Sequence, residues 1–273
     1  MSKRSFVFQM LPDNMMADYV CGAREALREF LWLHPEAAEN TEEILVHDAH
    51  SPMELPGEYL RDGLLVPVGS IEFCETLLRR WYGIEHLRPI NIPSQLLADQ
   101  FTGRKVAYIS SHADWENIVL GKAGFDPQHL FVKRADRAKA GPAFFFPDEQ
   151  SKAPSFEPGR LYLVSECVDI ASEWRAFVWK KQILDIRCYS GSPWAFPNRK
   201  TVEQMVATYT INTPMAYTLD VAVLPSGRTV IMEVHNFIAC GLYGFADPRI
   251  PLMLAAGVNH EFQVTAERRK SIW

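Results

Sequence analysis

The chain has 273 residues, of which 48% are hydrophobic and 22% charged, and its formal net charge is -5. This is ordinary globular composition, long enough for one large core or two modest domains. The acidic balance argues against a nucleic-acid partner, and no apolar run of about 18 residues predicts a membrane span. The five cysteines are scattered and form no C-x-x-C pair, and the N-terminus carries no apolar stretch typical of a signal peptide. We therefore expect a cytoplasmic protein with reduced thiols.

The first 95 residues alternate between strand-like and helix-like patterns. Residues 5–11 are typical of a strand, and residues 15–33 have helical spacing, with Asp13 or Asn14 as the expected N-cap. Residues 42–48 and the start of 63–83 again favour strands, and Gly69-Ser70 opens a helix that Gly83 ends. This alternation predicts an α/β domain over residues 1–95, closed by a proline-containing connection at 88–95.

Beyond that connection the pattern changes to antiparallel hairpins. Strands are expected at 129–136, 159–168, 173–179, 183–191, 216–224 and 228–234, with a short helix at 198–210. The second half, residues 96–273, is therefore predicted to be α+β.

The last hairpin places two acids opposite each other. A turn at Pro225-Ser226-Gly227 gives a register in which Leu219 faces Val234, Val221 faces Met232 and Val223 faces Val230, all on one apolar face. On the other face Asp220 lies opposite Glu233, and Thr218 lies opposite His235. Opposed like charges destabilise a sheet unless a cation lies between them, and two carboxylates with open positions suit Mg²⁺. Two unrelated acids on a solvated face are the alternative. If the pair is strained, neutralising either acid is expected to leave the fold intact or more stable.

The preceding hairpin places two arginines opposite each other. A three-residue loop at 180–182 gives an apolar face that pairs Trp174 with Cys188, Ala176 with Ile186 and Val178 with Leu184. The other face then pairs Arg175 with Arg187 and Phe177 with Asp185. Two opposed guanidinium groups indicate a bound anion, such as a phosphate or a carboxylate. Surface pairing of Arg187 with Asp185, or of Arg175 with Glu173, is the alternative.

These residues resemble the ATP-grasp superfamily of carboxylate–amine ligases. The family's metal motif is Asp, twelve residues, Glu, one residue, Asn. This chain has Asp220, Glu233 and then His235, with Asn236 next, so the resemblance implies His235 or Asn236 as the third metal ligand. Upstream, Glu166 and Glu173 have the family's spacing for an adenine linker and a ribose contact, which implies that Cys167, Val168 and Asp169 face the adenine.

The remaining nucleotide contacts also follow from the resemblance. Lys133 is similar to the family's phosphate-binding strand lysine, Lys105 is our choice for the earlier lysine, and residues 137–146 stand where a phosphate-covering loop is expected. Together Arg175, Arg187 and Lys133 resemble a small clade named for two arginines and a lysine.

The resemblance implies a fold and a reaction. We expect an ATP-grasp fold in which antiparallel sheets sandwich the nucleotide, with a hinge near 165–172. The implied enzyme uses ATP and Mg²⁺, with Mn²⁺ as an alternative ion, to join a small-molecule or peptide carboxylate to an amine through an acyl phosphate. Arg175, Arg187 and Lys133 are its expected catalytic residues. A phosphotransferase on the same fold and a non-catalytic nucleotide-binding module are the alternatives.

Overall fold

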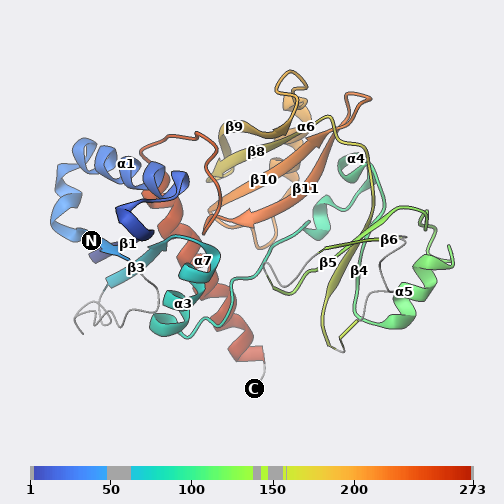
Figure 1. Ribbon diagram of the computed structural model, residues 1–273, viewed down its shortest axis with the longest axis horizontal. Helices are drawn as coiled ribbons and strands as arrows, with labels where there is room; N and C mark the ends of the chain where they lie inside the picture. Colours follow the sequence, from blue (N-terminus) through green and yellow to red (C-terminus); the bar gives the residue numbers. More distant parts are fainter. Residues whose placement is uncertain (1–2, 48–62, 138–142, 147–155, 158, 272–273) are drawn as a thin grey trace.

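The computed structural model describes residues 3–47, 63–137, 143–146, 156–157 and 159–271 of the chain (Figure 1). Three sheets organise the molecule: a three-stranded N-terminal sheet, a four-stranded central sheet and a four-stranded small sheet. Within the described residues, no helix is both long enough and apolar enough to cross a membrane.

The N-terminal sheet is parallel, as the α/β prediction requires. Its order is β2-β1-β3, with strands β1 (Lys3–Gln9), β2 (Thr41–Val46) and β3 (Gly63–Val68). Helices α1 (Asp18–Leu33) and α3 (Ile71–Tyr82) follow β1 and β3. Ser70 caps α3 by accepting from the Phe73 N–H, and Gly83 ends it at φ +63°, as predicted. The N-cap expected at Asp13 or Asn14 is wrong, because these residues belong to a separate 3₁₀ turn and α1 begins after Ala17.

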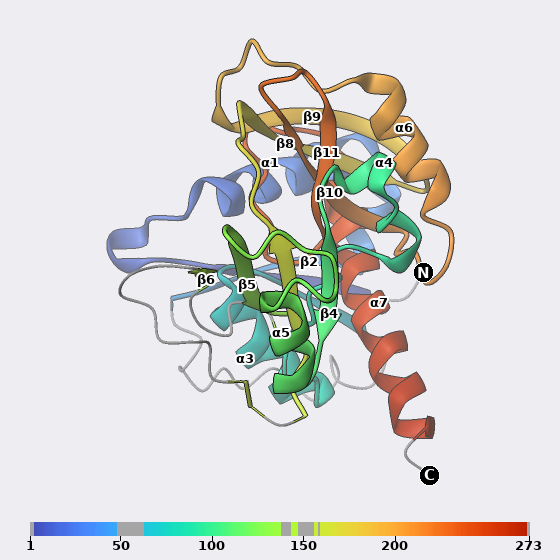
Figure 2. The ribbon, with the colours of Figure 1, turned by 90° about the vertical axis from the view of Figure 1, so that its right-hand side faces the viewer.

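The small sheet has the antiparallel order β4-β7-β5-β6. Its strands are β4 (Val106–Ile109), β5 (Leu130–Arg134), β6 (Phe144–Phe146) and β7 (Tyr162–Glu166), and helix α5 (His112–Val119) accompanies it. Leu130, Val132 and Val164 form a core with Trp115 and Ile118 of α5. In Figure 2, α5 covers one side of this sheet and the central sheet lies above it.

The central sheet is antiparallel in the order β11-β10-β8-β9. Its strands are β8 (Ser172–Trp179), β9 (Gln182–Gly191), β10 (Ala216–Val223) and β11 (Thr229–Asn236). One face packs against α6 (Arg199–Thr208); the core there contains the alternating apolar residues Trp174, Ala176, Val178, Leu219 and Val221. The short helix α4 (Asp99–Thr102) lies near β11. The apolar face predicted from the sequence is therefore the buried one, and the opposite side is called the cleft face below.

The predicted strand register is correct in the middle of both hairpins and wrong by one residue near their turns. Asp220 lies opposite Glu233 and Arg175 opposite Arg187, as expected. A bulge after Asp220 then pairs Val221 with Ile231, where Met232 was predicted. Ile231 and Met232 are both apolar, so alternation alone could not reveal the extra residue.

The tip of the β8–β9 hairpin also differs from the prediction. Trp179 pairs with Gln182, which leaves a two-residue turn of Lys180 and Lys181 where three loop residues were expected. Both lysines have positive φ angles, +48° and +65°. Lysine is not a residue that signals such a turn, since Asn and Gly are preferred there.

The C-terminal helix α7 (Ile250–Ser271) was not predicted, and it packs between the two halves of the molecule (Figure 1). One hydrophobic core contains Phe8 of β1, Leu27 of α1, Met253 of α7 and Phe177 of the central sheet. The domain boundary between residues 95 and 96 stays a prediction, although this core takes side chains from both sides of it.

Candidate functional site

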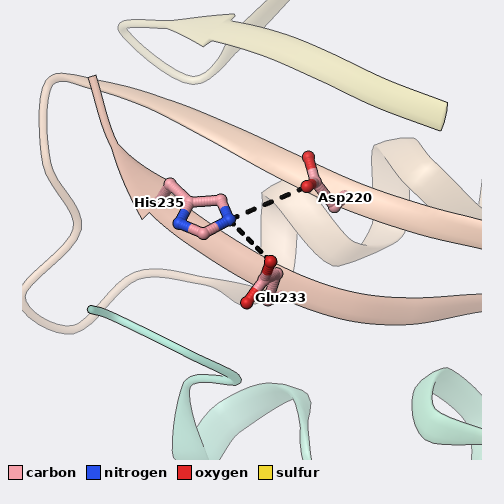
Figure 3. A group of neighbouring side chains, drawn as sticks. All are labelled: Asp220, Glu233 and His235. Atoms are coloured by element: carbon pink, nitrogen blue, oxygen red, sulfur yellow. Dashed lines mark ion pairs between the residues drawn. The ribbon is translucent and has the colours of Figure 1, made fainter. Parts of the chain in front are cut away.

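Three potential metal ligands meet on the cleft face of the central sheet (Figure 3). Asp220 of β10 and Glu233 and His235 of β11 each offer one ligand atom within 4.8 Å of the others. Nε2 of His235 lies 2.8 Å from Oε1 of Glu233 and 3.7 Å from Oδ2 of Asp220. The arrangement follows from the strand pairing, which sets Asp220 opposite Glu233 and leaves His235 two residues further along the same face.

Asp220 is bound by Arg175 from the neighbouring strand. Nε and Nη2 of Arg175 donate to the two carboxylate oxygens of Asp220 at 2.8 and 2.7 Å. Asp220 is 2% exposed, and Arg175 is also buried. Although burial by itself would lower the pKa of Arg175, the hydrogen bonds and charge of Asp220 raise it above its ordinary value.

Two tyrosines surround the same guanidinium. Arg175 lies 5.8 Å from the ring centre of Tyr189 and 5.2 Å from that of Tyr243, and the two rings stack at 5.1 Å. Nη1 of Arg175 also donates to the Gly241 carbonyl at 3.2 Å. No role beside Arg175 was predicted for either tyrosine, because only the long loop after β11 brings Tyr243 against Tyr189 of β9.

Glu233 is bound from the opposite sheet. Nζ of Lys133, on β5 of the small sheet, lies 2.5 Å from Oε2 of Glu233. Burial would raise the pKa of Glu233, but the hydrogen bond and charge of His235 and the charge of Lys133 outweigh it and hold that pKa well below its ordinary range. Lys133 thus faces the cluster across the cleft, and its role as a phosphate contact stays a prediction.

These cations remove the strain expected between the two acids. Arg175 neutralises Asp220, and Lys133 and His235 surround Glu233. We therefore now expect Asp220→Asn to lower the stability of the fold, where the sequence alone predicted an unchanged or higher stability, because the substitution would leave a buried guanidinium without its charge partner.

Arg187 lies opposite Arg175 in the sheet but has a different environment. Its side chain is exposed and binds Asp185, with Nε 2.7 Å and Nη2 2.6 Å from Oδ2. This is the surface pairing that the sequence left open as an alternative. The predicted anion between the two arginines has no counterpart among the described side chains, since each guanidinium binds its own aspartate.

The adenine linker predicted from the resemblance follows strand β7, and its role stays a prediction. Strand β7 ends at Glu166, whose carboxylate accepts from the backbone N–H groups of Lys105 at 2.9 Å and Asp126 at 2.8 Å. The Cys167 N–H donates to the His129 carbonyl at 2.9 Å. A hollow of about 420 Å³ is bordered by residues of the linker, Cys167, Val168 and Asp169, together with Asp126, His129 and Glu166.

The remaining predicted residues are placed as follows. Glu173 of β8 accepts from the Tyr189 hydroxyl at 3.4 Å. Lys105 contributes its backbone N–H to Glu166, as described above. Residues 138–142 of the expected phosphate-covering loop lie outside the described residues.

Asn236 takes no part in the cluster, which corrects its expected place beside the metal. Its Nδ2 donates to the Gly257 carbonyl at 3.0 Å and to Oε1 of Glu261 at 2.9 Å, both on α7. Successive side chains of a strand point to opposite faces, so His235 and Asn236 cannot both reach the cleft without a break in β11. Glu261 is buried, and this burial raises its pKa to about 7.

A small pocket of about 220 Å³ adjoins the cluster. Its lining includes Arg88, Arg175, His235, Cys240 and Tyr243. Below the cleft, buried Arg104 ties the two sheets together by donating to the Ile231 carbonyl at 2.9 Å and to Oγ of Ser165 at 2.7 Å. The cluster and Lys133 therefore lie between the central and small sheets, and the pocket adjoins the cluster on the side of residues 87–89 and the loop after β11.

Comparison with known proteins identifies this arrangement. The model of an ATP-grasp domain family, the second family of the clade named for two arginines and a lysine, matches residues 101–250. A search of curated proteins finds no significant match to the sequence.

Solved structures give the same fold at low sequence identity. The ATP-grasp ligase PsnB, complexed with a minimal precursor, aligns with a TM-score of 0.50 and 13% identity, covering 93% of this chain and 99% of PsnB. The D-cycloserine synthetase DcsG aligns with a TM-score of 0.50 and 10% identity, covering 94% and 99%. D-alanyl-alanine synthetase A from Vibrio cholerae has a TM-score of 0.48 and 11% identity, covering 95% and 100%. The predicted ATP-grasp fold is confirmed by the family match and by the alignments with PsnB and DcsG.

Proposed function

The chain belongs to the second ATP-grasp family of the clade named for two arginines and a lysine, and from this premise we propose that it is an ATP- and Mg²⁺-dependent ligase that joins a carboxylate to an amine. The observation that carries the proposal is the cluster of Asp220, Glu233 and His235 on one sheet, faced by Lys133 from the other. A strong concentration of opposite charge in a cleft between two sheets suits a polyphosphate and its cation better than it suits a structural ion pair.

The donor atoms of the cluster fit a divalent ion. Carboxylate oxygens from Asp220 and Glu233 are the ligands that Mg²⁺ prefers, and the imidazole of His235 also suits Mn²⁺. When bound, such an ion neutralises charge on the phosphate groups of ATP. The low pKa of Glu233 keeps its carboxylate ionised and available throughout the physiological range.

The chain's own cations have separate tasks in this proposal. Lys133 releases Glu233 and holds the inner phosphates of ATP. Arg175 holds Asp220 in position through its two hydrogen bonds. Arg187 is exposed on the same face and exchanges Asp185 for the transferred phosphoryl group, which its planar fork can bind bidentately.

In this proposal the reaction has two steps, phosphoryl transfer to the carboxylate and then attack by the amine. A carboxylate oxygen of the first substrate attacks the γ-phosphorus, the bond to the β-phosphate oxygen breaks, and ADP leaves. The amine nitrogen of the second substrate then attacks the acyl carbon, inorganic phosphate leaves, and the nitrogen loses a proton. We place the first substrate's carboxylate in the small pocket, because two arginines, Arg88 and Arg175, line it beside the cluster and outnumber its single acid, Glu261.

The substrate class has two precedents among the structural neighbours. PsnB has been solved with a precursor peptide, and DcsG is a D-cycloserine synthetase, so this fold accommodates both peptides and small molecules. We propose that the adenine of ATP contacts the linker of Cys167, Val168 and Asp169, and that Glu173 contacts the ribose.

Hydroxylamine trapping tests the proposal without knowledge of the amine. The protein is incubated with ATP, Mg²⁺, a panel of amino acids and dicarboxylic acids, and hydroxylamine, which attacks an acyl phosphate to give a hydroxamate. We expect equal amounts of ADP, phosphate and hydroxamate with at least one carboxylate. ADP with a stable phosphorylated product would instead identify a phosphotransferase, and ATP binding without any ADP would identify a binding module.

Arg187→Ala sharpens this test because the exposed side chain contributes little to folding. Turnover is expected to fall roughly 10²-fold while ATP affinity changes much less, since the contact strengthens only as charge develops on the transferred group. Lys200→Ala, which removes an exposed cation on α6, is the matched control and is expected to leave both quantities unchanged. Full turnover in Arg187→Ala would remove Arg187 from the mechanism.

A further inference from the structure

A second and larger hollow, called the α7 groove below, lies away from the cluster. Its volume is about 980 Å³, and it is bordered by the β8–β9 turn, by residues 213–215 before β10, by the first residues of β1 and β3, and by α7. None of the cluster residues lines it. Figure 1 shows α7 passing between the N-terminal elements and the central sheet, so the groove lies where three parts of the chain meet.

The floor of the α7 groove is apolar. Leu64 of β3, Trp179 of β8, Met215 and, from α7, Leu252 and Phe262 supply large side chains. Met215 is 53% exposed, which is unusual for a methionine beside so much other apolar surface. An apolar floor of this size fits the side chains of a ligand rather than bulk water.

The arginine and lysine residues that line the α7 groove have no acidic residue beside them in the described lining. Arg4, Lys180 and Lys181 border the groove, and no Asp or Glu is among the described residues that line it. The whole chain, by contrast, has 33 acidic and 28 basic residues. Three basic residues and no acid among the described lining residues of an acidic protein indicate a ligand that carries negative charge.

The backbone of the turn is a second, independent observation. Lys180 and Lys181 both adopt positive φ angles, +48° and +65°, in a tight turn where Asn and Gly fit with less strain. Nζ of Lys180 lies 5.2 Å from the ring centre of Trp179, so this ammonium is held over the apolar floor. Strain of this kind persists where the side chains themselves are needed.

We propose that the α7 groove docks an acidic peptide segment, which is the recognition element of a peptide substrate for the ligase described above. Asp or Glu side chains of the segment pair with Lys180, Lys181 and Arg4, and its apolar side chains cover Trp179, Met215 and Phe262. This inference rests on the proposed function for the role of the peptide, but the docking itself requires neither ATP nor turnover.

Selection from a phage-displayed library of random twelve-residue peptides tests the docking. The full-length protein is the bait, and the Lys180→Asn/Lys181→Gly variant is used for counter-selection. We expect the enriched peptides to carry at least two acidic residues together with an aromatic or branched apolar residue. Enrichment of peptides without acidic residues, or no enrichment over the counter-selected background, would overturn the proposal.

The same double variant shows whether weaker peptide binding results from the loss of the two positive charges or from a loss of stability. Asn-Gly is the favoured pair for this turn, so the variant is expected to melt at the same or a higher temperature than the parent. A fluorescein-labelled peptide from the selection is expected to bind it at least 10-fold more weakly, in a fluorescence anisotropy titration without nucleotide. Lys180→Arg/Lys181→Arg should retain binding within about 3-fold, and Lys200→Glu, remote on α6, should leave binding unchanged.

Three outcomes would contradict the proposal. Equal peptide affinity in the parent and the Asn-Gly variant would show that the lysines are not used. A lower melting temperature of that variant would remove the argument from backbone strain. A dimer that dissociates when the turn is changed, detected by sedimentation, would identify a second copy of the chain as the occupant. Hydroxamate formation with small carboxylates is measured separately, so failure of the docking and failure of the ligase are distinguishable.

Discussion

The two sides of strand β11 shift the pKa of a carboxyl group in opposite directions, that of partly buried Glu233 on one side and that of buried Glu261 of α7 on the other. On its cleft side, His235 faces Glu233 and Asp220, and every acid has a cationic neighbour. On its other side, Asn236 donates to Glu261 of α7 from a neutral amide. The pKa of Glu233 is therefore held well below its ordinary range, whereas the pKa of Glu261 is raised to about 7.

This difference shows that burial alone does not decide the charge of a carboxyl group. Burial opposes ionisation of both groups, but His235 and Lys133 outweigh it at Glu233, whereas the amide of Asn236 and the charge of Arg88 do not outweigh it at Glu261. The cleft thus stays ionised and ready for a metal ion, while the contact between β11 and α7 is most stable with its acid protonated. The predictions that follow alter one side of β11 at a time.

Among the substitutions considered, Asp220→Asn is expected to change the free energy of unfolding the most. It leaves the buried guanidinium of Arg175 without its charge partner and should lower the free energy of unfolding by about 3–5 kcal/mol, measured by urea denaturation. The double variant Arg175→Met/Asp220→Leu is the control, since it removes both charges and should lose less stability than the single change. Equal stability of Asp220→Asn and the parent would show that this pair is not buried in solution.

The next effect is expected from Glu261→Gln on the other side of β11. Because the folded pKa of about 7 lies above the ordinary value of 4.5, the wild type loses stability as pH rises between these values. Gln keeps an acceptor for Asn236 and does not ionise, so at pH 8 the variant should be more stable by about 3 kcal/mol, with no gain at pH 4. Glu39→Gln, an exposed change, should show no such pH dependence. Parallel stability curves for Glu261→Gln and the parent would exclude a raised pKa.

Glu233→Gln is expected to change the pH dependence of stability by a smaller amount, and in the acidic range: the parent loses stability through Glu233 as pH falls, but through Glu261 as pH rises. A carboxyl with a lowered pKa stabilises the fold above its ordinary pKa of 4.5, and this contribution is lost as pH falls below that value. In metal-free buffer the parent should therefore lose about 1 kcal/mol more than the variant between pH 5 and pH 2.5. Thermal melts over this range measure the difference, and an identical acid response would contradict the role of Lys133 and His235.

The smallest change in stability is expected from His235→Asn, which restores the residue that the ATP-grasp motif has at this position. The side chain is partly exposed, so the melting temperature should shift little. Loss of an imidazole donor should lower activation by Mn²⁺ relative to Mg²⁺, measured as the ratio of hydroxamate yields with the two ions. An unchanged ratio would mean that His235 does not bind the metal.

Which residues oppose each other in the middle of the two hairpins could be predicted from the amino-acid sequence. The two-residue period of a strand leaves one register that puts all apolar side chains on one face, so Asp220 had to meet Glu233 and Arg175 had to meet Arg187. The alternation of strands and helices likewise determined the N-terminal α/β elements, and the motif spacing pointed to the ATP-grasp fold.

The partners of these charged side chains could not be predicted, because they come from segments far away in the sequence. Lys133 reaches Glu233 from a different sheet, 100 residues away along the chain, and α7 binds Asn236 through Gly257 and Glu261. The bulge after Asp220 and the lysine turn of the β8–β9 hairpin also escaped the pattern, because apolar neighbours and lysines carry no local signal for them. Alternation along a strand acts between neighbouring residues, whereas an ion pair across a cleft depends on how remote segments pack, which no local pattern encodes.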